Sequence, residues 1–507
     1  MEYLMGIDVG TSGVKTVIID REGAIVSSGT VEYPLLTPRP GWAEQNPADW
    51  WSATVRCIKN SLKKSAVNSR NIKGIGLTGQ MHGSVFLDGK NNVIRPAILW
   101  CDQRTAKECA QITETVGEKR VFEITCNPVL TGFQAPKIIW MRNNESALYK
   151  RIAKVLLPKD YIRFMMTGEV ATDVSDASGT SLLDVKNRRW SDEILDKLNL
   201  SITLLPCCFE SPEITGHITK EVSQTTGLAE RTPVVAGAGD QAAGGVGSGI
   251  VQEGLVSVSL GTSGVVFAHS EKVFVDPKGR LHTFCHAVPG KWHLMGVMLS
   301  AGGSFRWLRD TFFSDAGKKS GNAYEAMTFL AKKVSPGSEG LVFLPYLTGE
   351  RCPYPDPNAR GVFFGLSLKH GKEHIVRAVM EGVAFGLKDS VRIMEEIGVP
   401  AGERFRISGG GGKSILWRRM IADIFNSDTV RLTVEEGPSY GAAVLAGAGT
   451  GIYKDVVSAC KRMIKEDEKS LLKPDRGNTA VYGRYYKVYN DLYSSLEKQF
   501  DNLAEIF

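Results

Sequence analysis

One carboxylate near the middle of the chain stands where a ligand could reach it. Asp240 follows an apolar run at residues 234–236 and lies within the glycine- and alanine-rich segment 237–245. Glycine lets the backbone turn sharply and lets other groups come close, so little side-chain bulk surrounds this acid. Asp240 is therefore the first candidate for a functional group.

Two near-copies of one turn lie on either side of Asp240, about half the chain apart: Gly10-Thr11-Ser12-Gly13 and Gly261-Thr262-Ser263-Gly264. Such a turn offers backbone N–H groups and hydroxyls to phosphate oxygens, and Lys15 adds a cation beside the first copy. Asp8, just before that copy, could hold a hydrated Mg²⁺. One copy alone would be interpreted as an ordinary polar hairpin. The repetition favours function and suggests two related lobes that face one site.

Two further segments could contact a polar ligand. The loop Gly79-Gln80-Met81-His82-Gly83 follows an expected strand at 72–78, and loops at strand ends bind ligands in α/β proteins. His82 could form a hydrogen bond with a polyol hydroxyl and Met81 could line the pocket, although a purely structural histidine is equally compatible with the pattern. Trp100, near another strand end, could form an apolar wall for the face of a sugar.

Two glycine-rich segments resemble nucleotide motifs without matching them. The run Ser408 to Ser414 lacks the glycine that a P-loop requires at position 407, which is Ile407. We interpret it as a loop that a flat ligand such as a nucleoside approaches closely. Residues 237–242 fit the G-x-G-x-x-A form of the dinucleotide fingerprint, but Asp240 would place negative charge near a pyrophosphate, which argues against that interpretation.

Composition sets the broad class. A chain of 507 residues with 43% hydrophobic and 23% charged residues is expected to form two or more globular domains. The net charge of +6 and the lack of a dense basic block do not imply nucleic acid. The N-terminus has an acid at position 2 and no basic segment typical of a signal peptide, and no apolar run approaches membrane-spanning length. Nine scattered cysteines without a C-x-x-C motif favour reduced thiols in a cytoplasm.

The expected elements alternate between strands and helices. Strands at 3–9, 14–20 and 24–33 form an antiparallel meander, and residues 47–65 form a helix capped by Asn46. Further strands are expected at 72–78 and 255–260, and further helices at 136–144, 145–154, 303–309 and 373–397, and after the glycine run as far as residue 426. The loop at 348–361 is long enough to be either functional or disordered.

Several side chains are expected to be structural. Asp102 and Arg104 should form an ion pair, and Cys207 and Cys208 should be buried thiols. The charged stretch 454–473 is interpreted as solvated surface. Tyrosines at helical spacing between 482 and 493 should pack a terminal helix onto the core.

Taken together, the motifs resemble those of the FGGY carbohydrate kinases from end to end, the xylulokinases most closely. The resemblance rests on four motifs and on the segment 361–381: Gly6-Ile7-Asp8-Val9-Gly10-Thr11-Ser12-Gly13-Val14-Lys15, Gly79-Gln80-Met81-His82-Gly83, Gly239-Asp240-Gln241-Ala242-Ala243-Gly244, and Ser259-Leu260-Gly261-Thr262-Ser263-Gly264. In the segment 132–140, Gln134 stands where the family usually has Thr, Ser or Pro.

This resemblance implies an α/β fold of two ribonuclease-H/actin-like lobes with a cleft between them. The lobe at residues 1–248 would bind sugar, and the lobe at residues 249–507 would bind nucleotide. The resemblance also implies that Asp240 is the catalytic base and that Asp8 serves Mg²⁺ through water. The expected sugar contacts are Met81, His82, Trp100, Asp240 and Gln241. The expected ATP contacts are Thr11, Ser12, Lys15, Gly261 and Thr262 for the phosphates, and Gly409, Gly410 and Ser414 for the adenosine.

The implied reaction is ATP-dependent phosphorylation of a ketopentose, D-xylulose to D-xylulose 5-phosphate. Gln241 stands where xylulokinases often carry Asn, so another ketose or a polyol, such as ribulose, L-xylulose or a glycerol-like substrate, is an alternative. An NAD-dependent dehydrogenase would leave the repeated turns unexplained. An ATP-driven scaffold of the actin or chaperone type would have no use for the loop around His82. The expected partners are therefore a small sugar and ATP, without nucleic acid or membrane, and a homodimer is the assembly considered.

Overall fold

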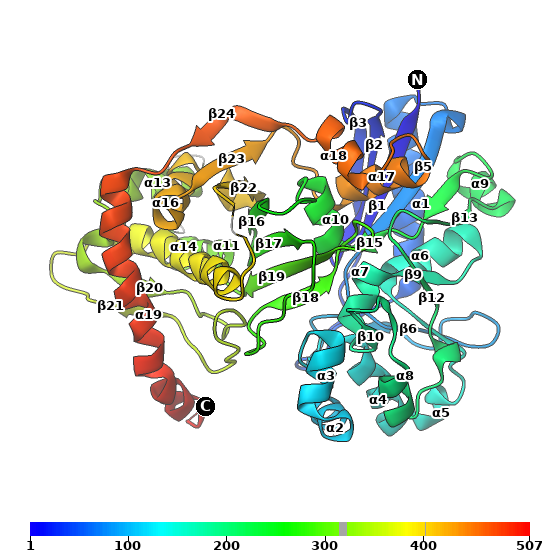
Figure 1. Cartoon of the computed structure of the whole chain (residues 1–507), viewed down its shortest axis with the longest axis horizontal. Helices are drawn as coiled ribbons and strands as arrows, with labels where there is room; N and C mark the ends of the chain where they lie inside the picture. Colours follow the sequence, from blue (N-terminus) through cyan, green and yellow to red (C-terminus); the bar gives the residue numbers. More distant parts are fainter. Residues whose placement is uncertain (314–321, 401, 507) are drawn as a thin grey trace.

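Two seven-stranded sheets organise the chain (Figure 1). The computed structural model describes residues 1–313, 322–400 and 402–506. The first sheet has the order β13-β14-β5-β1-β2-β3, with β15 also paired to β5, and the second has the order β18-β19-β17-β16-β22-β23-β24. Together with helices on their faces, these sheets give the expected α/β architecture of two lobes.

The first sheet begins with the predicted meander of β1 (Tyr3–Val9), β2 (Gly13–Asp20) and β3 (Ile25–Glu32). Three further strands, β5 (Ile72–Gly79), β14 (Pro233–Val235) and β15 (Ala238–Gly239), run parallel to β1, and β13 (Ile214–His217) closes one edge. In the register, Val9 lies opposite Gly79, and Gly79 lies opposite Gly239. Three parallel strands therefore end at one edge of the sheet.

The second sheet repeats this arrangement, which confirms the relationship that the two turns predict. Strands β16 (Val256–Leu260) and β17 (Gly264–Ser270) form an antiparallel pair around the second turn, and β22 (Arg404–Ser408) runs parallel to β16 as β5 does to β1. The other strands are β18 (His282–Cys285), β19 (Trp292–Met298), β23 (Asp428–Leu432) and β24 (Glu466–Leu472).

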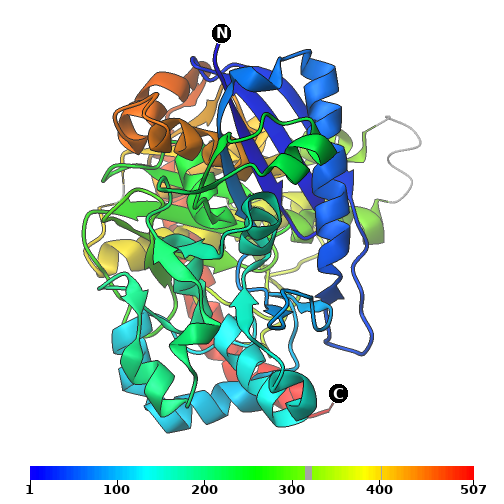
Figure 2. The ribbon, with the colours of Figure 1, turned by 90° about the vertical axis from the view of Figure 1, so that its right-hand side faces the viewer.

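Helices from both halves of the sequence cover the first sheet. Helix α1 (Pro47–Ser65) runs along one face (Figure 2), and the Asn46 side chain accepts a hydrogen bond from Ala48 N at 3.1 Å, so the predicted cap is confirmed. Helix α17 (Pro438–Gly449) packs on β1 and β5 and on α10 (Asp240–Gly247). This approach requires glycine, because a Cβ at Gly6 would lie 1.8 Å from the Ser439 carbonyl oxygen.

Helices α14 (Lys372–Glu396) and α16 (Ile415–Phe425) pack on the second sheet. Helices α11 (Gly302–Phe312), α13 (Ala323–Ala331) and the terminal α19 (Arg476–Ala504) pack in turn on these helices. The predicted tyrosine stripe is confirmed, since Tyr482, Tyr486, Tyr489 and Tyr493 are buried along α19. The loop at 348–361 is ordered against the same helix, where Tyr354 stacks on Tyr493 with ring centroids 3.5 Å apart.

A second core completes the N-terminal lobe below its sheet (Figure 1). Its helices are α2 (Ala106–Val116), α3 (Glu118–Thr125), α4 (Gln134–Asn144), α5 (Ser146–Tyr149), α7 (Val174–Ala177) and α8 (Asp192–Lys197). Helices α6 (Pro158–Thr167) and α9 (Lys220–Thr226) instead join α1 in the core of the first sheet. The remaining short strands and helices are β4 (Glu44–Gln45), β6 (Val85–Leu87), β7 (Ala97–Ile98), β8 (Lys154–Leu156), β9 (Ala171–Asp173), β10 (Leu183–Asp184), β11 (Arg189–Trp190), β12 (Cys207–Phe209), β20 (Val342–Leu344), β21 (Val362–Phe364), α15 (Gly409–Gly412) and α18 (Val456–Met463).

Two local predictions were wrong, and a third was incomplete. The helix expected at 145–154 is limited to Ser146–Tyr149, because the chain then turns so that Ala153 N donates to the Leu87 carbonyl at 2.8 Å in pairing β8 with β6. Cys207 is exposed and Cys208 only partly buried, because β12 pairs with β9 alone. The charged side chains of the stretch 454–473 are mostly exposed, as expected. The stretch also forms α18 and β24, and α18 buries Val456, Ala459, Cys460 and Met463.

Candidate active site

The shared edge of β1, β5 and β15 places three predicted groups together. Asp8 lies one residue before the end of β1, and Asp240 directly follows β15 as the first residue of α10. The loop after β5 carries Met81, whose side chain packs on Gly239, since a Cβ at that glycine would lie 2.9 Å from Met81 Cγ. Parallel strands end at one edge of a sheet, and ligands of α/β proteins bind there. Residues far apart in the sequence thus form one site.

Asp240 has the electrostatics of a base. Burial raises the pKa of its carboxyl to about 6, against hydrogen bonds from the side chain and backbone of Gln241 that lower it. A carboxylate with a raised pKa is a stronger proton acceptor, yet it is still ionised at neutral pH. Gln241, predicted to contact sugar, therefore lies beside the carboxylate and adjusts its basicity.

Asp8 faces the same carboxylate. Its pKa is raised to about 7, first by burial and then by the charge of Asp240, while the charge of Lys15 acts in the opposite direction. Its buried Oδ1 has no hydrogen-bond partner among the residues that the structure describes. A carboxyl group whose proton affinity is raised by burial and by a neighbouring carboxylate, with one buried oxygen that lacks a partner among the described residues, suits a hard cation with water in its shell.

One ring nitrogen of His82 is hydrogen-bonded to the protein backbone, which leaves the other available as an acceptor. Its backbone has φ 68°, and Lys137 Nζ donates to its carbonyl at 2.9 Å. Nδ1 lies 2.8 Å from the Gly179 carbonyl, and the ring stacks on Phe133 with centroids 4.6 Å apart. Because a carbonyl can only accept, Nδ1 carries the hydrogen and Nε2 is left as an acceptor. Burial lowers the pKa of His82 to about 3, so the ring is neutral at physiological pH.

Trp100 and the loop after β5 both form hydrogen bonds with Thr11 of the first turn. Trp100 is 41% exposed, and its Nε1 donates to Thr11 Oγ1 at 2.9 Å. The Thr11 hydroxyl in turn donates to Gln80 Oε1 at 3.2 Å. Thr11, predicted to bind phosphate, therefore already has side-chain partners, and the structure joins it to Trp100 and to the loop of Met81.

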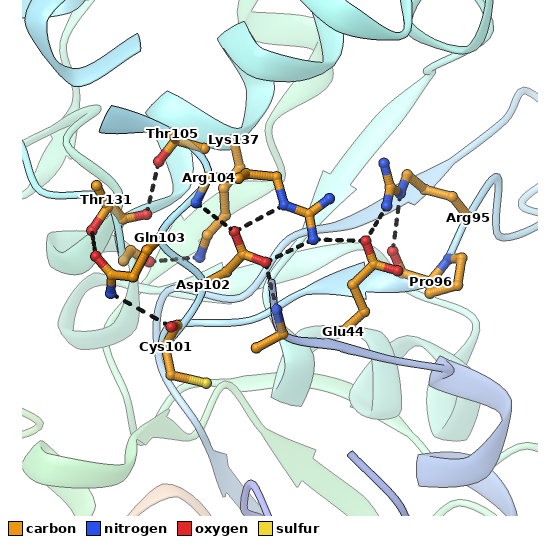
Figure 3. Close-up of polar contacts among 12 residues, drawn as sticks. Glu44, Arg95, Pro96, Cys101, Asp102, Gln103, Arg104, Thr105, Thr131 and Lys137 are labelled. Atoms are coloured by element: carbon orange, nitrogen blue, oxygen red, sulfur yellow. Dashed lines mark hydrogen bonds and ion pairs between the residues drawn. The ribbon is translucent and has the colours of Figure 1, made fainter. Parts of the chain in front are cut away.

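The predicted ion pair of Asp102 and Arg104 is confirmed and supports the Trp100 loop (Figure 3). Both Asp102 oxygens accept from Arg104, at 2.9 and 2.7 Å, and Asp102 Oδ2 also accepts from Ala43 N at 2.6 Å. Arg104 also forms an ion pair with Glu44 at 2.7 Å, and its guanidinium lies 3.5 Å from the ring centroid of Trp42. The side chains of Asp102 and Arg104 are buried and bind each other and neighbouring protein groups, so we interpret them as structural.

The first turn and the strand after it carry one exposed hydroxyl and one partly exposed cation. Ser12 is exposed, and Lys15 Nζ lies 2.5 Å from Glu436 Oε2 in the loop before α17. Lys15 is about one-third exposed, and an exposed ion pair of this kind contributes only roughly 0–1 kcal/mol. A phosphate could therefore replace Glu436 as the partner of Lys15 at little cost.

A separate cavity of about 1080 Å³ opens beside the second turn. Gly261, Thr262, Gly410 and Ser414 line it, which brings together four of the residues predicted to bind ATP. Thr262 is exposed, whereas its counterpart in the first turn is bound to Trp100. Gly409 is adjacent, with φ 81°, and a Cβ there would lie 2.7 Å from Leu260 backbone atoms. Thr11, Ser12 and Lys15 lie outside this lining.

Sequence patterns missed the aromatic walls of both regions. Phe133 and Phe284 surround His82, with ring centroids at 4.6 and 6.2 Å, and Phe305 and Tyr324 line the cavity. Their spacing looks like that of ordinary core residues, so no local signal distinguishes them. Gln134, the departure from the family pattern, donates to the Gly83 carbonyl at 3.2 Å and so supports the His82 loop.

Two other kinds of site are absent from the part of the chain that the structure describes. Across residues 1–313, 322–400 and 402–506, no group of three or more His, Cys, Asp or Glu side chains could hold a metal ion. Over the same described ranges, none of the helices combines the length and the apolar character needed to cross a membrane.

Comparison with known proteins assigns the chain to a family. Models of the N-terminal and C-terminal domains of the FGGY family of carbohydrate kinases match residues 3–247 and 256–450. A xylulose kinase of Lactococcus lactis is 40% identical over 506 residues, 100% of this chain and 99% of the relative. One of Escherichia coli is 41% identical over 494 residues, 97% and 99% of the two chains. The crystal structure of a xyloylose kinase from Brucella ovis has a TM-score of 0.90 at 36% identity, covering 98% of this chain and 100% of its own. The chain therefore belongs to the FGGY family of carbohydrate kinases.

Proposed function

We propose that this chain transfers the γ-phosphoryl group of ATP to the terminal hydroxyl of D-xylulose, giving D-xylulose 5-phosphate, with Asp240 as the general base. The observation that carries the proposal is the position of Asp240, at the strand-end edge beside Met81 and His82. The names of the full-length relatives support D-xylulose as the substrate. Membership of a carbohydrate kinase family favours this reaction over a dehydrogenase or an ATP-driven scaffold.

The chemistry follows from the groups at the site. The carboxylate of Asp240 accepts the proton of the sugar hydroxyl as its oxygen attacks the γ-phosphorus, and the bond to the leaving ADP breaks. In such transfers the protein mainly positions the reactants and stabilises charge, and general-base help contributes ~10²–10⁴-fold. His82 Nε2 accepts a hydrogen bond from a second sugar hydroxyl, and Trp100 covers an apolar face of the sugar.

The two lobes divide the binding. Residues 1–248 provide the sugar contacts and the base, and residues 249–507 provide the cavity beside Thr262, which suits the adenosine and phosphates of ATP. The repeated turns would face the phosphates from opposite lobes, with Ser12 and Lys15 on one side. Closure of the lobes would exclude water and so limit hydrolysis of ATP.

Asp8 is the group that fits Mg²⁺. Its Oδ1, buried without a partner among the described residues, and the neighbouring Asp240 carboxylate favour a cation held through water. When bound, the ion would offset negative charge on the ATP phosphates. Asp8 itself would orient the water shell of the ion, and it would become ionised as the ion replaces the proton that its raised pKa favours.

A cytoplasmic location is part of the proposal. All nine cysteines are free thiols in the structure, which suits a reducing compartment. ATP as the second substrate is consistent with the same location.

A substrate panel tests the proposal. ADP release would be measured with D-xylulose, L-xylulose, D-ribulose, L-ribulose and glycerol, and the phosphorylated position would be determined by NMR. D-Xylulose should give the highest kcat/KM, with phosphate on its terminal oxygen. A higher kcat/KM for another ketose or polyol would move the assignment to that sugar, and ADP release independent of any sugar would overturn the kinase proposal.

A further inference from the structure

A fully buried ionic cluster lies behind the strand end that carries Asp240. Lys159 Nζ lies 2.5 Å from Asp160 Oδ1, 2.9 Å from Asp173 Oδ1 and 3.7 Å from Asp176 Oδ2, and all four side chains have no solvent exposure. One cation among three carboxylates is a costly arrangement to bury, and burial raises the pKa of Asp160 and of Asp176. Replacing such a cluster with apolar residues is often neutral or stabilising, so its presence calls for a role other than stability.

A chain of hydrogen bonds leads from this cluster to the proposed base. Asp173 Oδ2 accepts from the hydroxyl of Ser175 at 2.5 Å and from the backbone N of Ser175 at 2.8 Å. The Ser175 oxygen in turn accepts from Gly239 N at 3.2 Å. Gly239 is the residue immediately before Asp240. The Lys159–Asp173 ion pair is therefore connected, through the hydrogen bonds of Ser175, to the peptide that precedes the carboxylate.

The donor and acceptor roles along this chain are fixed. A backbone N–H can only donate, so the Ser175 oxygen must accept from Gly239. The serine hydroxyl then has one hydrogen to give, and Asp173 lies at the short distance typical of a hydroxyl bound to a carboxylate. Lys159 occupies the other oxygen of Asp173. Ser175 therefore cannot rotate away without breaking two buried hydrogen bonds.

The backbone that the chain holds has few other restraints. Strand β15 contains only Ala238 and Gly239 and pairs with β5 alone. Gly239 also has Met81 against it, where a Cβ would lie 2.9 Å from Met81 Cγ. A larger side chain at position 239 is thus excluded. Glycine at this position leaves the backbone conformationally free unless another group fixes it. The hydrogen bond from Gly239 N to Ser175 supplies that restraint, at a position where backbone movement would displace the Asp240 carboxylate.

We propose that Ser175, anchored by Asp173 and Lys159, is a positioning residue that fixes the Gly239–Asp240 peptide and so aims the Asp240 carboxylate at the sugar hydroxyl. The inference rests on the proposed role of Asp240 as the base. A displacement of a reacting group by about 1 Å can cost ~10²-fold in rate. A part of that loss is expected when Ser175 is removed, because β5 and α10 still hold the ends of the segment.

The chain provides a matched control. Ser178, one helical turn after Ser175, is also buried, donates to the Val174 carbonyl at 2.7 Å and accepts from Cys285 N at 3.0 Å. Ser175→Ala and Ser178→Ala thus remove the same atoms from the same region, and each breaks one hydrogen bond to a distant backbone N–H. Of these two serines, Ser175 is the one that binds the peptide before Asp240.

The experiment measures kcat, both KM values and Tm for Ser175→Ala, Ser178→Ala, Asp240→Asn and the double variant Ser175→Ala/Asp240→Asn. Ser175→Ala should lower kcat roughly tenfold, a part of the loss that misplacement can cause, with both KM values changed less than about twofold. Ser178→Ala should keep kcat while lowering Tm by a similar amount. In the Asp240→Asn background, Ser175→Ala should cause no further loss of the residual rate, because the group that it positions is already inactive.

Several outcomes would overturn the proposal. An unchanged kcat for Ser175→Ala would make the residue structural, as would equal losses of kcat in the two alanine variants. If Ser175→Ala lowered kcat by the same factor in the Asp240→Asn background as in the unmodified protein, Ser175 would act through another group. If Asp240→Asn itself retains near-normal turnover, the base assignment fails whatever Ser175→Ala does. Should the alanine variant not fold, Ser175→Cys keeps a similar volume with a weak donor and acceptor, and its kcat should fall in the same direction.

Discussion

Lys15 in β2 and Glu436 in the loop before α17 form an ion pair with Nζ and Oε2 2.5 Å apart, which joins the first strand pair to a segment near the end of the chain. Lys15→Ala should raise the KM for ATP roughly tenfold, consistent with the ~1.5–3 kcal/mol of a hydrogen bond to a charged group, and leave the KM for sugar nearly unchanged. Glu436→Gln, which keeps the shape and removes the competing charge, should lower the KM for ATP slightly. Equal losses for both substrates in Lys15→Ala would indicate a folding defect instead.

The two hydroxyls of the repeated turns should differ in effect. Thr262 is exposed at the cavity of about 1080 Å³. Thr262→Val should therefore raise the KM for ATP more than the KM for sugar. Thr11 binds Trp100 and Gln80, so Thr11→Val should also raise the KM for sugar by loosening that loop. Measuring both KM values for both variants separates the two roles, and identical profiles would mean that the turns act alike.

Asp240→Asn should abolish sugar phosphorylation and largely keep sugar binding. Asparagine fills the same volume but cannot accept the proton, and loss of a general base costs at least ~10²-fold. Turnover would be measured alongside sugar affinity by calorimetry. A variant that keeps more than about a tenth of the normal turnover is incompatible with that minimum loss, and the role would then be withdrawn.

The pH dependence should report the same carboxylate. Burial raises the pKa of Asp240 to about 6, and only the ionised form can accept a proton. The kcat/KM for sugar should therefore be level above that pKa and fall about tenfold per pH unit below it. The Gln241 side chain lowers this pKa, so Gln241→Leu should move the acid limb to higher pH. An acid limb that does not move would mean that another group controls it.

His82→Ala should raise the KM for D-xylulose roughly tenfold, because a hydroxyl left unpaired in a partly dry site costs ~1–3 kcal/mol. The KM for ATP should change little. His82 is neutral well below pH 5, since burial lowers its pKa to about 3, so its contribution should not vary between pH 5 and 9. Exposed His217 offers a control histidine on β13. An unchanged sugar KM with a lowered Tm would make His82 structural.

The sequence alone determined the features that depend on local patterns. The repeated turn predicted two related lobes, and the meander at the N-terminus and the helix capped by Asn46 followed from the spacing of apolar, turn and capping residues. Such signals lie within a few residues of one another, where backbone geometry and hydrogen bonding are largely local. The same locality made Asp240, between a strand and a glycine-rich run, identifiable as a candidate.

Only the tertiary structure decided how these residues meet. The tautomer of His82 depends on the carbonyl of Gly179, and the hydrogen bond that holds the peptide before Asp240 comes from Ser175. Helix α17, from the C-terminal half, covers the first sheet because glycines on β1 and β5 let it approach closely. Each contact joins residues far apart in the sequence through packing of separate elements, and no spacing pattern records which element comes to lie against which.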